Sequence, residues 1–228
     1  MNGTARSLVL FDIDGTLMRG AGPHHKLALI EGVRRVTGCD VTLDGVATAG
    51  SLDRDLIAGM LRAQGRSERA IRDVLRRAMR ECQERYLESC PADLTPFLCP
   101  DVRQTLEALR AGNVAMGVVS GNLAAIGWRK LELAGVRHFF AFGAFAEDGR
   151  SRTRLAQVAY WRALRQQIVR KGSRVSLIGD HPNDVEAARR NGFQSIAVAS
   201  GVVSREELAA SRPDILLDRL GQLELARI

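Results

Sequence analysis

The ten residues from Leu8 to Leu17, which read LVLFDIDGTL, constrain the fold of this chain more than any other stretch. They begin with four consecutive apolar residues. Such a run is too short for a helix and does not alternate with polar residues, which is typical of a parallel strand covered on both faces. Asp12 then stands at the carboxyl end of the predicted strand, and Asp14 follows two residues later. Because ligands of open α/β sheets bind at that end of the strands, we expect both aspartates in a functional site.

The residues that follow the acidic pair indicate a sharp turn. Gly15 and Thr16 let the backbone change direction and leave amide groups that can bind a phosphate. An aspartate at the end of a strand can also serve only as a cap or form an Asx-turn. Two aspartates followed by Gly-Thr favour the functional interpretation, in which Gly15 and Thr16 bind substrate.

Beyond residue 100, short apolar segments alternate with helical patterns. Predicted strands lie at 114–119, 139–142, 175–178, 195–199 and 215–217. Predicted helices lie at 101–109, with Asp101 as the cap, and at 123–134, 153–169 and 182–192. Strands that alternate with helices predict a parallel sheet with right-handed crossovers. The predicted fold class is therefore α/β, with a Rossmann-like doubly wound parallel sheet as its core.

Residues 20–96 differ from the rest because they contain helical patterns and no convincing strand. Predicted helices lie at 26–37, 53–64 and 67–89, the last one capped by Ser67. A segment rich in glycine and proline precedes them, and a proline-rich segment follows them. We therefore predict a helical cap domain over 20–96, inserted into a core domain made of 1–19 and 97–228.

Polar residues also end the later predicted strands. Ser120 ends one of them, and Asp180 and Asp184 follow another. The carboxyl ends of parallel strands meet at one edge, so four carboxylates are expected to converge there and to repel one another unless a cation lies among them. Oxygen ligands with room for water and phosphate select Mg²⁺. An aspartate can also accept a phosphoryl group as an aspartyl-phosphate.

Three separate motifs resemble the signatures of the haloacid dehalogenase superfamily. They are DIDGTL at 12–17, the apolar strand that ends in Ser120, and GDHPND at 179–184. Four shorter features are similar to its phosphoglycolate-phosphatase-like branch: GAG at 20–22, AGSLDRD at 49–55, SGN at 120–122 and EDGRSR at 147–152. The resemblance covers most of the chain, and it implies a Mg²⁺-dependent phosphatase that hydrolyses a small phosphomonoester, phosphoglycolate-like or a sugar phosphate, through an aspartyl-phosphate.

The resemblance also implies roles for the four aspartates. Asp12 would be the nucleophile and a Mg²⁺ ligand. Asp14 would give its backbone carbonyl to the metal, while its side chain acts first as general acid and then as general base. Asp180 would complete the metal shell, and Asp184 would hold the metal directly or through water. A charge in the first turn of a helix is the alternative explanation for Asp184.

The phosphate is expected to bind at the SGN motif. Ser120 would donate a hydrogen bond to a phosphate oxygen, with Gly121 and Asn122 beside it as further substrate-binding residues. Ser120 could also cap the predicted helix at 123–134.

The superfamily usually supplies a lysine in its third motif, but the corresponding region here has Arg150, Arg152 and Arg154. Alignment to the branch favours Arg152 as the cation that neutralises the nucleophile and the phosphate. Arginine stays charged and pairs with both kinds of anion, although its geometry differs from that of lysine. Lys130 is the alternative, but its position on a predicted helix favours an exposed or capping lysine.

Cap residues are expected to choose the substrate. The candidates are Arg19, His24, Asp53 and Arg54. For Asp53 the alternative is a helix cap, and for the other three it is an ordinary surface loop.

Charge and cysteine content limit the other function classes. The net charge of +7 permits a nucleic-acid partner, but 30 of the 33 basic residues are arginines spread over many helices, which favours solvated faces. The resemblance implies a small phosphorylated metabolite as the partner instead. The four cysteines form no CxxC pair, which indicates free thiols. Neither a secretory signal nor a membrane-spanning run is present in the sequence. We therefore expect a cytoplasmic protein without a membrane partner.

Two other functions remain open. A sugar phosphomutase of the same superfamily shares both aspartates and a helical cap, and a non-catalytic, nucleic-acid-associated protein would account for the positive charge. A 2-haloacid dehalogenase is disfavoured by Asp14, which that reaction does not need. The sequence names neither the substrate nor the choice between a monomer and a homodimer.

Overall fold

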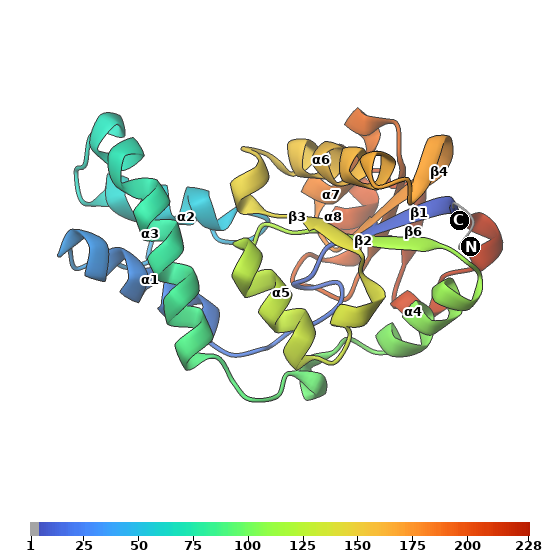
Figure 1. Ribbon diagram of the computed structural model, residues 1–228, viewed down its shortest axis with the longest axis horizontal. Coiled ribbons are helices and arrows are strands. Elements are labelled where there is room, and N and C mark those ends of the chain that lie inside the picture. Colours follow the sequence, from blue (N-terminus) through green and yellow to red (C-terminus); the bar gives the residue numbers. More distant parts are fainter. Residues whose placement is uncertain (1–4) are drawn as a thin grey trace.

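Six parallel strands form one sheet in the order β3-β2-β1-β4-β5-β6 in the computed structural model, which describes residues 5–228 (Figure 1). The strands are β1 Ala5–Phe11, β2 Ala115–Val119, β3 Phe142–Ala144, β4 Val169–Gly179, β5 Gln194–Val198 and β6 Ile215–Leu217. This order is that of the doubly wound Rossmann sheet, in which the crevice opens where the order reverses, next to β1. The predicted fold class is confirmed.

Strand β1 is central because its side chains are apolar on both faces. Leu8 and Leu10 pack into one hydrophobic cluster, while Val9 and Phe11 pack into the other, and all four are fully buried. The register aligns Phe11 with Val118 of β2 on one side and with Ile178 of β4 on the other. The three strands therefore end at the same level, and the residues after them meet at one edge.

Helices cover both faces of the sheet. In Figure 1, α6 and α7 lie on one face, and α4 and α5 lie on the other. The helices of this part are α4 Val102–Ala111, α5 Ala124–Leu133, α6 Arg152–Arg165, α7 Pro182–Asn191 and α8 Arg205–Ala210. Short 3₁₀ turns lie at Thr95–Phe97, Arg137–Phe139, Ala146–Asp148, Leu220–Gln222 and Leu225–Arg227.

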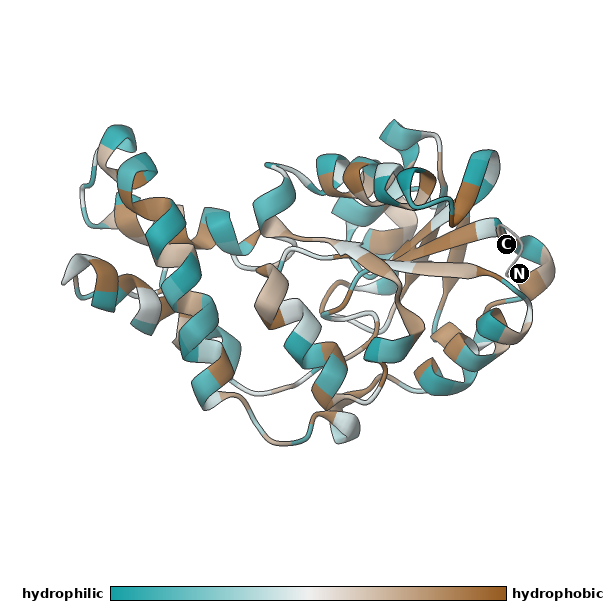
Figure 2. Ribbon diagram, in the orientation of Figure 1, coloured by the Kyte–Doolittle hydropathy of each residue, from teal (hydrophilic) through white to brown (hydrophobic). Residues whose placement is uncertain are grey.

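Three further helices pack on one another beside the sheet, at the left of Figure 1. They are α1 His24–Thr37, α2 Asp53–Ala63 and α3 Glu68–Ser89. Ser67 caps α3, since its hydroxyl accepts a hydrogen bond from the Ala70 amide. Figure 2 shows hydrophobic residues gathered between these helices and hydrophilic residues on their outer faces, which is the amphipathic pattern that the sequence predicts.

The two segments that join these three helices to the sheet run side by side. The Arg19 amide donates to the Phe97 carbonyl at 2.9 Å, and the Cys99 amide donates to the Leu17 carbonyl at 2.9 Å. Met18 and Leu98 form an antiparallel bridge between these two bonds. The chain therefore leaves and re-enters the sheet-containing part through one hydrogen-bonded pair of segments.

Several predicted boundaries differ from the structure. The predicted strand at 139–142 is a 3₁₀ turn followed by β3, because Phe139 and Phe140 are buried in the core instead of pairing along the sheet. The predicted helix at 153–169 ends at Arg165, and β4 begins four residues later. Asp101 does not cap α4 with its side chain. It has a φ of 65°, and its carboxylate lies 3.6 Å from the Arg219 guanidinium.

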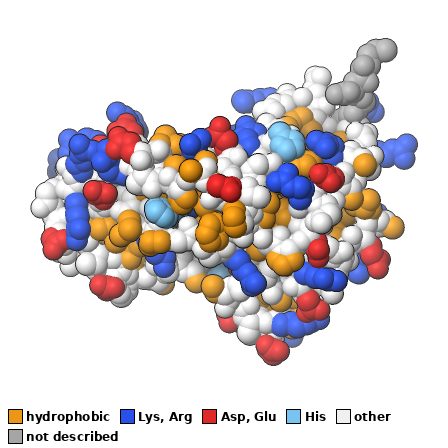
Figure 3. Space-filling model, turned by 90° about the horizontal axis from the view of Figure 1, so that it is seen from below, with side chains coloured by type: hydrophobic (Ala, Val, Ile, Leu, Met, Phe, Trp, Pro, Cys, Tyr) orange, Lys and Arg blue, Asp and Glu red, His pale blue; other side chains and the backbone are white. Residues whose placement is uncertain are grey.

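The surface carries mixed charge. Figure 3 shows basic and acidic side chains interspersed over the face seen from below. No helix within residues 5–228 is both long enough and apolar enough to cross a membrane. The four cysteines are free thiols, as the sequence indicated.

We predict that Gly32→Ala destabilises the protein although alanine favours helices. A Cβ at Gly32 would lie 2.6 Å from the backbone nitrogen of Cys82, so α1 and α3 would have to separate. Overpacking of this kind costs about 1–3 kcal/mol, which exceeds the gain of about 1 kcal/mol in helix propensity. Urea unfolding measures the difference. The matched control is Glu31→Ala at the exposed neighbouring position, and equal stability of the two variants would contradict the prediction.

Candidate active site

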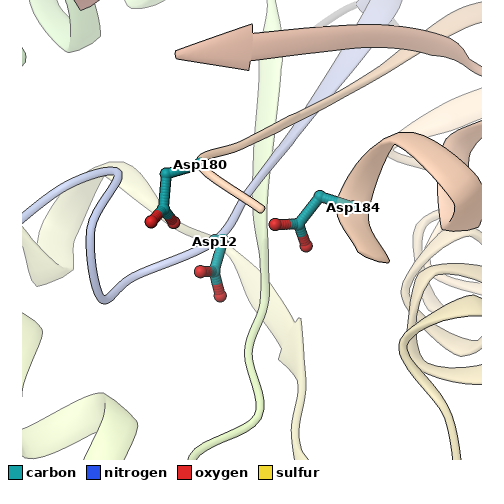
Figure 4. Close-up of side chains that lie close together, drawn as sticks. All are labelled: Asp12, Asp180 and Asp184. Atoms are coloured by element: carbon teal, nitrogen blue, oxygen red, sulfur yellow. The ribbon is translucent and has the colours of Figure 1, made fainter. Parts of the chain in front are cut away.

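Three aspartates lie together at the carboxyl edge of the sheet. Asp12 directly follows β1, Asp180 directly follows β4, and Asp184 lies in the first turn of α7 (Figure 4). Each offers a carboxylate oxygen, and these three oxygens lie within 4.8 Å of one another. All three residues are at most 5% exposed. The parallel register of β1 and β4 is what brings Asp12 and Asp180 together.

Glycines allow the loops to approach these carboxylates. Gly15 has a φ of 92°, and a Cβ there would lie 2.1 Å from an Asp180 oxygen. A Cβ at Gly201, on the other side, would lie 1.7 Å from the same oxygen. Thr16 donates a hydrogen bond from its hydroxyl to the other Asp180 oxygen at 3.2 Å. In this structure Gly15 and Thr16 therefore support Asp180, the expected metal ligand.

Arg152 is the cation within the acidic group. Its Nη1 donates to Asp12 Oδ1 at 2.6 Å, and its Nε lies 3.3 Å from Asp184 Oδ1. It is the first residue of α6, where the Ser151 hydroxyl caps the helix. Arg150 is exposed, and Arg154 bonds to Gln157 and stacks on Trp161. Of the three arginines in the third-motif region, Arg152 is thus the one that reaches Asp12.

One cation does not neutralise three buried carboxylates. Burial raises the pKa of Asp12 to about 7, that of Asp180 to about 7 and that of Asp184 to about 6, and mutual repulsion adds to the effect while Arg152 opposes it. Neither oxygen of Asp184 accepts a hydrogen bond of acceptable geometry, although both are buried. Closely spaced hard oxygen donors with unsatisfied charge fit a divalent cation. Asp12, Asp180 and Asp184 are the residues that could hold it.

Asp14 does not join this group. Both of its oxygens lie 2.8 Å from Lys130 Nζ, and Oδ2 accepts a hydrogen bond from Asn122 at 2.7 Å. Desolvation acts to raise the pKa of Asp14, but the attraction of Lys130 and His25 outweighs it and holds the pKa below its ordinary range. The expectation that four carboxylate side chains converge is therefore wrong: three converge, and the fourth is paired with a lysine.

Lys130 was expected to be exposed or to cap its helix, and this is also wrong. Its side chain is 3% exposed, because α5 turns this position toward Asp14. Besides Asp14, its ammonium group contacts Asn122 Oδ1 at 2.8 Å and His25 Nδ1 at 3.1 Å. Lys130 lies four residues after the buried Ile126, so the helical spacing contained a signal that it faces the interior.

The SGN loop folds back on itself. The Ser120 hydroxyl accepts hydrogen bonds from the Asn122 backbone amide at 3.2 Å and from its side-chain amide at 2.6 Å. Ser120 does not cap α5. The amide of Leu123, the N-cap residue of α5, donates to the carboxylate of Asp53, and the amide of Ala124, the first residue of that helix, donates to the carboxylate of Glu147. Asp53 does not cap its own helix, since it is the first residue of α2 and Leu52 stands at the N-cap position.

The other three candidates for substrate choice contact different segments of the chain. Arg19 donates to the Ser200 carbonyl, and Arg54 donates to the Gly149 carbonyl. His24 is half-buried beside Gly22, whereas its neighbour His25 contacts Lys130 and Asp53. Sequence reasoning missed His25, since two adjacent histidines at a helix start give no sign of which one faces inward.

The sequence matches the family of haloacid dehalogenase-like hydrolases over residues 7–192. The chain belongs to this family. The expected superfamily is thereby confirmed, and so is the expectation of a hydrolytic enzyme. Among curated relatives, the phosphoglycolate phosphatase of Vibrio parahaemolyticus is 26% identical over 218 residues, which cover 95% of this chain and 93% of that protein.

Two solved structures share the fold over nearly the whole chain. A predicted phosphoglycolate phosphatase from Haemophilus somnus aligns with a TM-score of 0.65 at 19% identity, over 96% of this chain and 97% of that one. A β-phosphoglucomutase from Clostridium difficile aligns with a TM-score of 0.68 at 15% identity, over 98% and 95% of the two chains. At these identities the likeness establishes the fold.

We predict that Asp184→Asn stabilises the protein at pH 8 in the presence of EDTA. The raised pKa values mean that the folded state binds more protons than the unfolded state between pH 4 and 7, so the acidic group lowers the free energy of unfolding as the pH rises through that window. Removing one charge should therefore raise the Tm by about 2 °C or more at pH 8. At pH 5 the gain should be smaller.

Scanning calorimetry at both pH values measures this difference. Asp218→Asn, at an exposed aspartate directly after β6, serves as the control and should not change Tm with this pH dependence. A variant that is less stable than the wild type at pH 8 with EDTA would show that the carboxylates do not repel one another as inferred.

Proposed function

We propose that this protein is a Mg²⁺-dependent phosphatase that hydrolyses a small phosphomonoester through an aspartyl-phosphate on Asp12. The observation that carries the proposal is the contact of Asp12 with Arg152 inside a group of three buried carboxylates. Membership of a hydrolase family and the similarity to phosphoglycolate phosphatases support it. A phosphoglycolate-like substrate or a sugar phosphate is the substrate class that we propose.

Asp12, Asp180 and Asp184 would hold Mg²⁺, together with the backbone carbonyl of Asp14. When bound, the ion neutralises charge on the phosphate and on the carboxylates. Arg152 adds a second positive charge beside the nucleophile. Phosphoryl transfer depends mainly on position and charge neutralisation, and this arrangement provides both.

In the proposed reaction a carboxylate oxygen of Asp12 attacks phosphorus, and the bond to the ester oxygen breaks. Protonated Asp14 gives its proton to that leaving oxygen. Asp14 then takes a proton from the water that attacks the aspartyl-phosphate, which releases inorganic phosphate and restores Asp12. Because Lys130 favours the charged form of Asp14, proton donation requires the carboxylate to turn from Lys130 toward the leaving oxygen.

We further propose that Ser120, Gly121 and Asn122 bind the phosphate, with the turn at Gly15 and Thr16 on its other side. Residues 20–96 would act as a cap over the core made of 1–19 and 97–228. A small phosphorylated metabolite is favoured over a nucleic acid as partner, because basic side chains are interspersed with acidic ones on the face that Figure 3 shows.

A phosphomutase is the second candidate, and the structural likeness to a β-phosphoglucomutase favours it. The two functions share the attack by Asp12 and differ in the acceptor of the phosphoryl group. Water as the acceptor indicates a phosphatase, whereas transfer to a sugar phosphate indicates a mutase. A sugar monophosphate labelled with ³²P distinguishes them, since free phosphate and an isomeric sugar phosphate separate readily.

We predict that Asp12→Asn abolishes phosphate release. An amide cannot replace the carboxylate as nucleophile, and loss of a nucleophile lowers kcat by about 10⁴-fold or more. A phosphate-release screen over small phosphomonoesters, with Mg²⁺ and with EDTA, measures the activity, and Asp218→Asn is the control. Failure of the wild type to release phosphate from any ester in Mg²⁺ would refute the proposed function.

We predict that Arg152→Lys lowers kcat/KM about tenfold or more, which corresponds to at least about 1.4 kcal/mol of transition-state stabilisation. A lysine keeps the charge but cannot contact Asp12 and Asp184 with separate nitrogens, as Arg152 does. Arg154→Lys on the same helix is the matched control and should retain wild-type rates. Equal rates for the two variants would show that the reaction needs only a positive charge at position 152 and not the two nitrogens of arginine.

A further inference from the structure

Asp53 joins the helical insert to the SGN loop through its backbone and its side chain. The Asp53 amide donates to the Gly121 carbonyl at 2.8 Å, and Asp53 Oδ2 accepts from the Leu123 amide at 2.7 Å. These two contacts bracket Asn122, the residue between them. Although Asp53 begins α2, its carboxylate therefore binds the N-cap residue of α5, next to Glu147, which binds the first amide of that helix.

Burial and charge strengthen the hydrogen bond from the Leu123 amide to the Asp53 carboxylate. The Asp53 side chain is 4% exposed, and its charge lies at the positive end of the α5 dipole. A hydrogen bond from an amide to a carboxylate is stronger than one between neutral groups. The same oxygen lies 2.9 Å from His25 Nε2, so the buried carboxylate is supported from both domains.

The SGN loop has little freedom while Asp53 is in place. A Cβ at Gly121 would lie 2.6 Å from the Ser51 carbonyl oxygen, so the segment before Asp53 packs directly on the loop. The side-chain amide of Asn122, between these two held positions, donates hydrogen bonds to Ser120 Oγ and to Asp14 Oδ2. Holding the backbone on both sides of Asn122 thus orients the groups proposed to bind phosphate.

A second set of contacts leads from Asp53 to Asp14. His25 lies between Asp53 and Lys130, with 2.9 Å from Nε2 to the carboxylate and 3.1 Å from Nδ1 to the ammonium group. Lys130 contacts both oxygens of Asp14. The proposed phosphate-binding loop and the proposed proton-transfer group therefore both depend on the position of one residue of the insert.

We propose that Asp53 is a positioning residue of the reaction, which sets the SGN loop and the Lys130–Asp14 pair when residues 20–96 lie against the core. The inference rests on the proposed function. Asp53 acts through other residues and does not touch the substrate. Other contacts hold the two parts together elsewhere, since Arg54 donates to the Gly149 carbonyl and the Ala125 amide donates to Gln83 Oε1.

The test compares Asp53→Asn with Asp55→Asn, an exposed aspartate two residues further along α2. Two esters are used in Mg²⁺: an alkyl phosphate, whose leaving oxygen needs a proton, and p-nitrophenyl phosphate, whose leaving group does not. For Asp53→Asn we expect kcat on the alkyl ester to fall about tenfold or more and KM for both esters to rise, because the SGN loop is displaced. The fall in kcat should be smaller with the nitrophenyl ester. Asp55→Asn should match the wild type.

Hydrogen exchange of the segment 120–125 supplies a readout without turnover. We expect the Leu123 amide to exchange faster in Asp53→Asn than in the wild type and in Asp55→Asn, while the Tm of the variant shows that the fold is retained. Asp53→Glu, which restores the charge on a longer side chain, should recover part of the protection and part of kcat.

The outcomes separate the two proposals. A wild type that releases no phosphate from either ester overturns the proposed function and, with it, the role of Asp53. An active wild type whose Asp53→Asn variant has the kcat, KM and exchange of Asp55→Asn overturns the role of Asp53 alone. Equal losses on both esters, without a change in KM, would assign Asp53 a purely structural role and also overturn the inference.

Discussion

Repulsion among Asp12, Asp180 and Asp184 is the constraint on which the rest of the site depends. Two of these residues are brought together by the register of neighbouring strands, which the hydrophobic core of the sheet fixes. Packing thus holds charges where electrostatics alone would separate them. Arg152 relieves part of the repulsion, and the remainder favours a bound cation. The stability of the sheet is what makes a site of this charge density possible.

The sequence predicts the parts of this structure that depend on local signals. The apolar run before Asp12 indicates a strand buried on both faces, and the polar residues at strand ends indicate the edge where the site lies. Sheet order and register depend on contacts between distant segments, and no local pattern encodes them. Helix ends are similarly weak signals, as the early end of α6 at Arg165 shows.

The role of Lys130 was missed for a related reason. Its partner Asp14 lies 116 positions away, so the pair exists only after β1 and α5 have packed together. A lysine on a helix is usually exposed, and only the position of the neighbouring helix reveals the exception. Asp53 is a similar case, because a carboxylate at the start of α2 looks like a local cap, whereas it accepts a hydrogen bond from Leu123 at the start of α5.

The paired segments around Met18 and Leu98 restrict how the helical insert can move. Two separate flexible linkers would leave the insert free to reorient. Segments 17–19 and 97–99 are instead hydrogen-bonded to each other, so the two ends of the insert stay together. Residues between the paired segments are therefore tethered to the sheet-containing part at both ends, so contacts such as that of Asp53 with the Leu123 amide form within one molecule at high effective concentration. A few hydrogen bonds are then enough to fix the position of the insert.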